Sequence, residues 1–443
     1  MKTNKLKAQN CLNRRLGQSE HIYWLLDQLY CLNFVAFAEI EGKLSEKALQ
    51  RALEVLQLEN PTLRTQIIID GAGRPCFKSV SAAEQPLKLE LRELRNWRRA
   101  IESQLGSPFE QGQAPLARFL WFRGKGKKSV VAMVFHHSIA DGRSGVYALF
   151  DVLRRAAGQK QSVQAKNAQP SSQQLDLIKD KGLVGAKLKE LKFWLTKGKE
   201  SLKFREQLPG YNMTPGSTRE IKIVPFSIPP KTSKALLASC RDNGTTVHGA
   251  LGAALLFAIA DEFEESESRY LGLNSLVDLR GELKGGLTEG DLGLYISTVT
   301  TNHLMDAQPD FWRLAREIPK QLKEVMNSGD ANLINSVYPE TPLYTPNKSG
   351  AKRLQKVVAM APASSMLTNI GKVDVTPLGK GLCIKNVSFA VSPPAQHPIC
   401  MTTASYDGQI CTNILYDQCK LKATQIKRIT ANILSRLLHE AGE

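Results

Sequence analysis

Residues 129–147 read SVVAMVFHHSIADGRSGVY, and this stretch decides the fold class. A valine-rich apolar run ends in two adjacent histidines, His136 and His137, and a tight turn follows at Asp141-Gly142. Apolar residues at helical spacing come next: Val146, Leu149, Phe150, Val152 and Leu153. The order predicts a strand, a loop and a helix. The loop then lies at the carboxyl end of a strand, where α/β proteins usually place reactive side chains.

We call residues 136–142, HHSIADG, the histidine loop. A histidine titrates near neutrality and can take a proton from a hydroxyl or an amine. The spacing His-His-x-x-x-Asp-Gly arises by chance in a chain of this length about once in a thousand sequences. The alternative is that both histidines are polar residues that end a buried strand and are satisfied by hydrogen bonds. The spacing, together with the flanking strand and helix, favours a reactive loop.

The size and composition of the chain indicate a globular protein with more than one core. Its 443 residues exceed what a single hydrophobic core usually fills, so we expect two lobes. The longest apolar stretch, residues 249–260, is too short to span a bilayer and predicts a buried helix. The basic, polar start of the chain has no apolar core behind it, so no signal peptide is expected.

The eight cysteines are scattered and form no C-x-x-C pair, which favours reduced thiols in a cytoplasmic protein. The histidines outside the loop show no metal-ligand spacing, so no metal is expected. The net charge of +17 favours an acidic partner, such as a phosphate-bearing cofactor, an acidic carrier protein or an anionic membrane. Nucleic acid is not expected, because no helix-turn-helix, RNP or zinc-finger signature is present.

Alternating helical and strand patterns divide the chain into three parts and predict an α/β fold. Residues 1–157 form an N-terminal lobe that carries the histidine loop. Residues 158–210 hold a linker rich in Gln and Ser and a lysine-dense helix, expected over residues 181–204. That helix either packs its apolar stripe on the body or docks on an acidic carrier or a membrane surface. Residues 211–443 form a C-terminal lobe.

The periodicity also predicts individual elements. Helices are expected at residues 19–30, 46–56, 232–242, 247–263, 311–326 and 423–441. Strands are expected at residues 32–41, 63–70, 74–80, 116–123, 129–135, 219–228, 269–278, 293–302, 382–391, 399–406 and 409–416. Ser45 and Thr246 are expected to cap the helices that follow them.

With these motifs in place, the chain resembles the chloramphenicol-acetyltransferase-like superfamily over essentially its full length. This superfamily holds condensation domains, wax ester synthases, plant alcohol acyltransferases and polyketide-associated acyltransferases. The main match is His136 to Gly142, and supporting matches lie at residues 60–65 (NPTLRT), 278–280 (DLR) and 293–298 (GLYIST). Residues 15–20 and 405–408 look closest to the polyketide-associated, dimycocerosyl-transferase-like branch.

Two departures bear on the branch. The plant-type Asp-Phe-Gly-Trp-Gly is absent, and so is the condensation-domain opening S-x-A-Q-x-R. Both favour the O-acyltransferase branch without excluding a peptide-forming domain.

The resemblance implies two similar lobes, each a sheet covered by helices, with a tunnel between them and the histidine loop at its middle. Donor and acceptor would enter from opposite faces. No cofactor is bound permanently, and the substrate is an acyl thioester on coenzyme A or an acyl carrier protein. The acceptor is the hydroxyl of a lipid-like or polyketide alcohol, or an amine if the chain is a free-standing condensation enzyme. We expect a monomer in the cytoplasm, with peripheral membrane contact as an option.

The resemblance also suggests roles for single residues. His137 is the general base, which deprotonates the acceptor and returns the proton to the leaving thiolate. His136 is structural and faces the opposite side of the strand. Asp141 is structural and forms a buried ion pair with Arg280. Gly142 permits a close approach that a side chain would block.

The donor to the oxyanion is the least specified part of the site. Ser297 or Thr298 could supply a hydroxyl, because the family places this strand near the tunnel; the alternative is that both are ordinary strand residues. A further alternative for the whole chain is a non-catalytic relative that binds a carrier protein. The intact His137 and Asp141 speak against it.

Overall fold

The computed structural model describes residues 11–159, 166, 195, 199, 208–211, 219–263, 268–283, 286–306, 310–331, 345–359, 363–374, 377–379 and 381–443. The linker and the basic helix expected within residues 158–210 lie almost entirely outside this described part of the chain. Their assignments therefore stay predictions.

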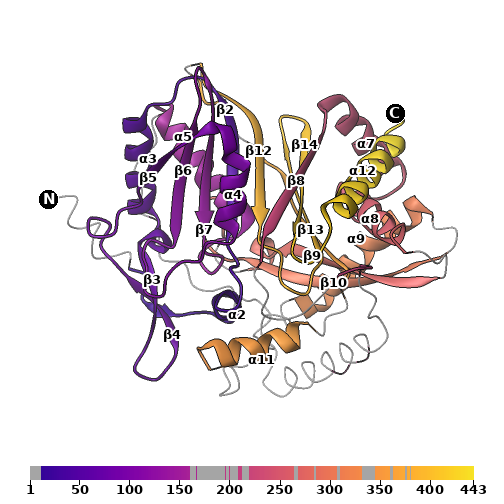
Figure 1. The fold of residues 1–443 in the computed structure, drawn as a ribbon, viewed down its shortest axis with the longest axis horizontal. Coiled ribbons are helices and arrows are strands. Elements are labelled where there is room, and N and C mark those ends of the chain that lie inside the picture. The colour runs from indigo at the N-terminus through magenta and orange to yellow at the C-terminus, as the bar shows by residue number, and fades with distance from the viewer. Residues whose placement is uncertain are drawn as a thin grey trace.

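Two large sheets stand side by side and form two lobes (Figure 1). The five-stranded sheet has the order β12-β2-β7-β6-β5, and the six-stranded sheet has the order β10-β9-β11-β13-β14-β8. A small third sheet, β1-β4-β3, lies at one end of the N-terminal lobe. Most strand pairs are antiparallel, but β5–β6, β9–β11 and β11–β13 are parallel. The mixed sheets confirm the α/β fold class expected from the sequence.

The strands have the following bounds. In the N-terminal lobe they are β1 (Arg14–Arg15), β2 (Phe34–Glu41), β3 (Thr65–Ile69), β4 (Pro75–Ser79), β5 (Leu89–Glu93), β6 (Ala117–Arg123) and β7 (Lys128–Phe135). In the second half they are β8 (Ile221–Ile228), β9 (Arg269–Asp278), β10 (Ile296–Met305), β11 (Ser365–Lys372), β12 (Cys383–Val391), β13 (Ile399–Tyr406) and β14 (Gln409–Asp417).

Helices cover both sheets. The N-terminal lobe holds α2 (Gln18–Asp27), α3 (Glu46–Glu59), α4 (Trp97–Leu105) and α5 (Gly142–Ala156). The second half holds α7 (Pro230–Asp242), α8 (Val247–Ala260), α9 (Phe311–Ser328), α11 (Lys348–Val358) and α12 (Ala423–Glu440). Ser45 and Thr246 cap α3 and α8 through their side-chain oxygens, as expected. α8 is buried along nearly its whole length because it is apolar on every face.

Strand β7 delivers the histidine loop from the centre of the N-terminal sheet. Every residue from Ser129 to Phe135 is buried, since β2 and β6 flank the strand and helices cover its faces. A central strand covered on both faces is expected to read as a continuous apolar run rather than an alternating one. This burial explains the valine-rich sequence before His136.

Strand β12 comes from the second half of the chain but completes the N-terminal sheet. It runs antiparallel to β2, with Phe389 opposite Ala36. Its last five residues, Val387 to Val391, are buried and need a sheet edge and a core around them. The expected boundaries at residues 157 and 211 therefore do not coincide with the division between the two sheets, because one strand of the N-terminal sheet comes from the second half of the chain. Periodicity alone cannot show which sheet a strand joins.

Most elements lie close to their predicted bounds, and β9 and β13 match them. β10 begins at Ile296 rather than at residue 293. The Gly293 carbonyl and the Tyr295 amide are bonded to Asp141, and the Tyr295 carbonyl accepts from the Leu279 amide. The sequence reasoning missed β5, α4, α11 and β11.

Among the described residues, no single helix combines the length and apolar composition that a membrane span needs. Only α7 and α8 together meet the criterion, and they bend by 97° at their junction.

Candidate active site

The histidine loop is held by the first turn of α5. The Asp141 side chain accepts a hydrogen bond from the Ser144 amide at 2.9 Å and so caps the helix. Gly145, in the same turn, has no room for a side chain, because a Cβ there would lie 2.5 Å from the Phe34 ring. The loop is therefore fixed at its helical end by a cap and by close packing.

Asp141 also ties the loop to the second half of the chain. Its carboxylate is fully buried and accepts from Arg280 Nη2 at 2.9 Å and from the Tyr295 amide at 3.0 Å. The Asp141 amide in turn donates to the Gly293 carbonyl at 3.0 Å. The expected Asp141–Arg280 ion pair is present, and both partners are almost inaccessible to water. This cluster joins the two lobes at the histidine loop.

His137 is oriented by one hydrogen bond and two aromatic rings. Its Nδ1 lies 3.0 Å from the Ala140 carbonyl, which can only accept, so Nδ1 carries the proton. The Nε2 atom therefore presents a lone pair. The imidazole packs against Tyr23, with ring centroids 4.3 Å apart, and against Phe34 at 5.0 Å. These contacts hold the ring in one tautomer and one orientation.

Burial keeps His137 neutral. Desolvation lowers the pKa of the imidazole from 6.5 to about 4, although the nearby Asp141 carboxylate and the Ala140 carbonyl favour the charged form. At neutral pH the ring is in the free-base form that can accept a proton.

The imidazole lines a narrow cavity between the lobes, with a volume of about 50 Å³. The N-terminal sheet contributes Phe34, Phe389 and Val391, the histidine loop contributes His137 and Gly142, and α5 contributes Arg143. The remaining lining residues are Leu276, Val277, Asp278, Arg280, Ile296, Thr368, Asn369 and Ile370. His137 is thus neither sealed in one core nor turned to bulk water. The cavity lies far below the roughly 300–1,000 Å³ of small-molecule pockets, so substrates require the walls to move apart.

Gly142 forms part of the cavity wall. A Cβ at this position would approach the Phe389 ring to 3.1 Å, which is closer than side chains normally pack. The absence of a side chain therefore keeps the space beside His137 open, as expected for this glycine.

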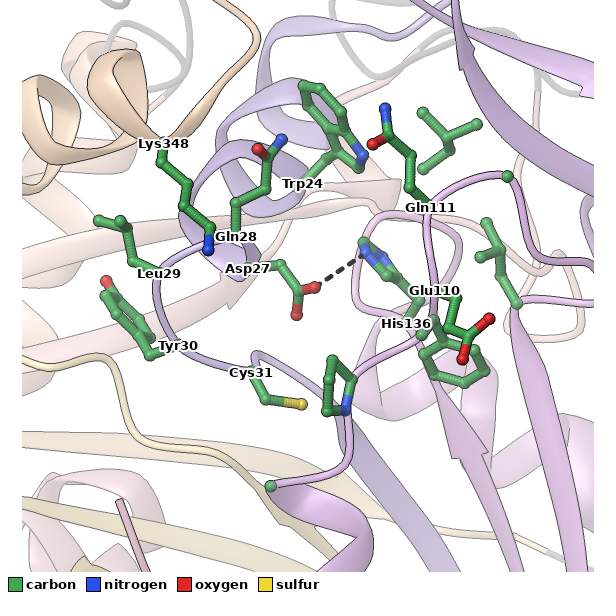
Figure 2. Close-up of a pocket in the computed structure, with 16 residues that line it drawn as sticks. Trp24, Asp27, Gln28, Leu29, Tyr30, Cys31, Glu110, Gln111, His136 and Lys348 are labelled. Carbon is green, nitrogen blue, oxygen red and sulfur yellow. Dashed lines mark ion pairs between the residues drawn. The ribbon is translucent and has the colours of Figure 1, made fainter. Parts of the chain in front are cut away.

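His136 faces away from this cavity, as strand geometry predicts. Its Nδ1 accepts a hydrogen bond from the Ser138 amide at 3.1 Å, so the proton lies on Nε2. That nitrogen points toward Asp27 at the end of α2, 3.6 Å from Oδ2, in a separate and larger pocket (Figure 2).

The two candidate hydroxyls of β10 differ in position. The Ser297 hydroxyl is buried and donates to the Ala331 carbonyl, so it is occupied on the face of the sheet that α9 covers. The side chain of Thr298 points to the opposite face of the sheet from Ser297, the same face as Ile296, which lines the cavity. Neither residue lines the cavity around His137. The Ser297 hydroxyl is therefore already bonded in this geometry, and a donor role for Ser297 or Thr298 stays a prediction.

Sequence reasoning missed three parts of the site. Tyr23 packs against His137, but helical spacing in residues 18–27 gave no sign of which face of the helix meets the loop. β11 supplies Thr368, Asn369 and Ile370, yet its short, partly polar sequence was not recognised as a strand. The third is the cap by Asp141, which could have been read from an aspartate placed directly before a helical pattern.

Comparisons with known proteins agree with the geometry. A family model of the condensation domain matches residues 24–339. Chondramide synthase of Chondromyces crocatus is 25% identical over 341 residues, which make up 71% of this chain but 8% of that protein. The chain therefore spans only a small part of this curated relative.

Solved structures share the fold over nearly the whole chain. Polyketide synthase associated protein 5 from Mycobacterium tuberculosis has a TM-score of 0.70 at 13% identity, covering 97% of this chain and 99% of that one. Trichothecene 15-O-acetyltransferase from Fusarium sporotrichioides has a TM-score of 0.67 at 11% identity, covering 96% and 95%. At these identities the likeness concerns the fold alone. The family match extends over more than half of the sequence, and the chain belongs to the condensation-domain family.

Proposed function

We propose that the protein transfers an acyl group from a thioester to a hydroxyl acceptor, with His137 as the general base. The observation that carries the proposal is the free Nε2 lone pair of a buried, neutral imidazole that lines a cavity between two lobes. A base that meets its substrate in a water-poor cavity can accept a proton without losing the acyl group to hydrolysis.

The reaction balances with the substrates and His137 alone. Nε2 takes the hydroxyl proton as the oxygen attacks the thioester carbonyl, which forms a carbon–oxygen bond and a tetrahedral oxyanion. The carbonyl re-forms as the carbon–sulfur bond breaks. The imidazolium then returns its proton to the leaving thiolate. No nucleophilic side chain is needed.

The neighbours of His137 support this cycle. The Ala140 carbonyl accepts from Nδ1 and stabilises the imidazolium that forms in the middle of the reaction. Asp141 lies close enough for its charge to favour the protonated ring. Its carboxylate is occupied by Arg280, Ser144 and Tyr295, so we assign it to holding the loop rather than to proton transfer.

A hydroxyl acceptor suits the buried base. A neutral alcohol enters a dry cavity without the desolvation cost of a charge, whereas an amine is protonated in neutral solution and must lose a proton first. The donor would be a thioester on coenzyme A or on an acyl carrier protein. The net charge of +17 is compatible with either, since both carry phosphate.

Amide formation is the second candidate, and a specific observation favours it. The matching family model is that of condensation domains, and chondramide synthase is 25% identical to this chain over 341 residues. The chemistry at His137 would be the same, with nitrogen in place of oxygen.

A paired acceptor screen tests both candidates. The protein is incubated with an acyl-coenzyme A series and with acyl carrier protein thioesters, and each donor is offered matched acceptors such as decanol and decylamine. Mass spectrometry then identifies ester or amide. We expect ester formation; amide alone would select the second candidate. If neither product forms with any donor while a carrier protein still binds tightly, the protein is a non-catalytic relative.

A further inference from the structure

A second pocket lies on the side of the histidine loop opposite to His137. It has a volume of about 410 Å³, within the range of small-molecule sites. It shares no lining residue with the cavity around His137. Its walls come from the end of α2 and the chain after it, from residues 106–112 and from the first residue of α11.

The floor of this pocket pairs an acceptor with a donor. The Asp27 side chain is nine-tenths buried, and its Oδ1 accepts from the Leu32 amide at 2.7 Å. Oδ2 makes no hydrogen bond to any described residue and faces His136 Nε2, which carries a proton because Nδ1 accepts from Ser138. Figure 2 shows the two groups directed toward each other across the pocket.

The separation of these two atoms leaves room for one more oxygen. At 3.6 Å, Oδ2 and Nε2 are too far apart for a direct hydrogen bond. A hydroxyl oxygen about 2.7–2.9 Å from each could accept from Nε2–H and donate to Oδ2 at the same time. A purely apolar group would give Asp27 Oδ2 and His136 Nε2 no hydrogen bond beyond their 3.6 Å ion pair, so the floor favours a ligand that carries a hydroxyl.

Apolar side chains, two of them aromatic, stand among the walls and favour an apolar ring next to that hydroxyl. The apolar side chains in the pocket are Trp24, Leu29, Ile67, Phe109 and Leu116. The mouth is open to solvent, since Glu110, Gln111, Gly112 and Lys348 are exposed. A ligand can therefore enter between residues 110–112 and the start of α11 without passing His137.

We propose that this pocket binds a small apolar ring bearing a hydroxyl group, held by Asp27 and His136 and distinct from the reaction cavity. The inference rests on the pocket and its floor, not on the proposed acyl transfer. Because His136 and His137 are adjacent, a ligand bound to His136 would contact the histidine loop on the side opposite to the reaction cavity. A second molecule bound there could therefore influence the position of the loop that carries His137.

The test measures the binding of phenol, with toluene as the probe that lacks the hydroxyl, by ligand-observed NMR titration. We expect phenol to bind the wild-type protein at least about tenfold more tightly than toluene, as expected for a hydrogen bond to a charged group. Asp27→Asn should weaken phenol binding about tenfold, because the asparagine oxygen stays with the Leu32 amide and the NH₂ group in the place of Oδ2 cannot accept from the hydroxyl. Gln111→Trp, at the exposed mouth, should abolish binding.

His137→Ala is the matched control and should leave phenol binding unchanged, since the other cavity is not involved. Thermal unfolding checks that each variant is folded, and if Asp27→Asn is not, Gln111→Trp decides. Equal binding of toluene and phenol overturns the proposal. So does phenol binding that survives Gln111→Trp or that disappears in His137→Ala.

Discussion

Replacing Asp141 by asparagine should destabilise the protein and slow acyl transfer together. Asparagine keeps one oxygen for the Ser144 amide and therefore keeps the helix cap. It places an NH₂ group where the second carboxylate oxygen accepts from Arg280 and from the Tyr295 amide. The new NH₂ group then faces two other donors, the Arg280 guanidinium and the Tyr295 amide, and the Arg280 charge loses its buried partner.

The structure sets the size of the effect. Removing one partner of a buried ion pair usually costs about 3–5 kcal/mol. Arg280 keeps a second partner, Asp278, at 3.0 Å, and that carboxylate is 34% exposed and only partly compensates. We therefore expect Asp141→Asn to lower the free energy of unfolding by about 2–4 kcal/mol. The exposed pair Arg92–Glu90, at 2.7 Å, is the matched control, and Glu90→Gln should cost less than about 1 kcal/mol.

Equilibrium unfolding in urea, measured alongside thioester-dependent acyl transfer, supplies both readouts. The double variant Asp141→Asn/Arg280→Gln should be less destabilised than the sum of the single variants, with a coupling of about 1–3 kcal/mol. An Asp141→Asn protein that unfolds like the wild type would refute the ion-pair reasoning. If that protein also lost activity, Asp141 would have a chemical role instead.

Two of the remaining predictions concern the site, and the third concerns a buried histidine in α8. Transfer should keep its kcat/KM from pH 7.5 down to pH 5.5, because the pKa of His137 is about 4; a fall of about tenfold at pH 5.5 would indicate an ordinary histidine. Gly142→Ala should cost about 1–3 kcal/mol and slow transfer by crowding Phe389, whereas Gly281→Ala, with open space around it, should do neither. Burial also lowers the pKa of His248 to about 4, so its contribution to stability is complete above pH 6.5 and is lost as the pH falls toward 4. Between pH 7 and pH 5, the free energy of unfolding of His248→Gln, measured in urea, should therefore fall by about 2 kcal/mol less than that of the wild type.

Local patterns predicted the parts of the fold that depend on local chemistry. The apolar run before His136 gave β7, and Ser45 and Thr246 marked the starts of α3 and α8. Partners that are distant in sequence were harder to predict. β12 pairs with β2 across more than 300 residues, and nothing in residues 383–391 indicates which sheet they join. The sequence pattern shows that a strand is apolar, but it does not show which neighbouring strand pairs with its backbone.

The residues of the site likewise fall into those that a local pattern or the resemblance predicted and those that depend on contacts distant in sequence. The spacing singled out the histidine loop, and the family resemblance assigned the base to His137 and paired Asp141 with Arg280. Tyr23 was not predicted, because its contact with His137 depends on how α2 is placed against the loop. Asp27 was missed for the same reason, since only the fold brings it opposite His136. Ser297 was expected near the reaction, but the alternation of β10 turns its hydroxyl toward Ala331.

The most direct test of the account is the single-turnover rate of acyl transfer in His137→Ala, with His439→Ala, an exposed histidine near the end of α12, as the control. Both proteins are first shown to unfold like the wild type, and product is then followed with the best thioester and acceptor from the screen. We predict that His137→Ala loses about 10²–10⁴-fold in rate while His439→Ala retains the wild-type rate. A folded His137→Ala protein that transfers the acyl group at the wild-type rate would contradict the account, because the imidazole would then not be the base.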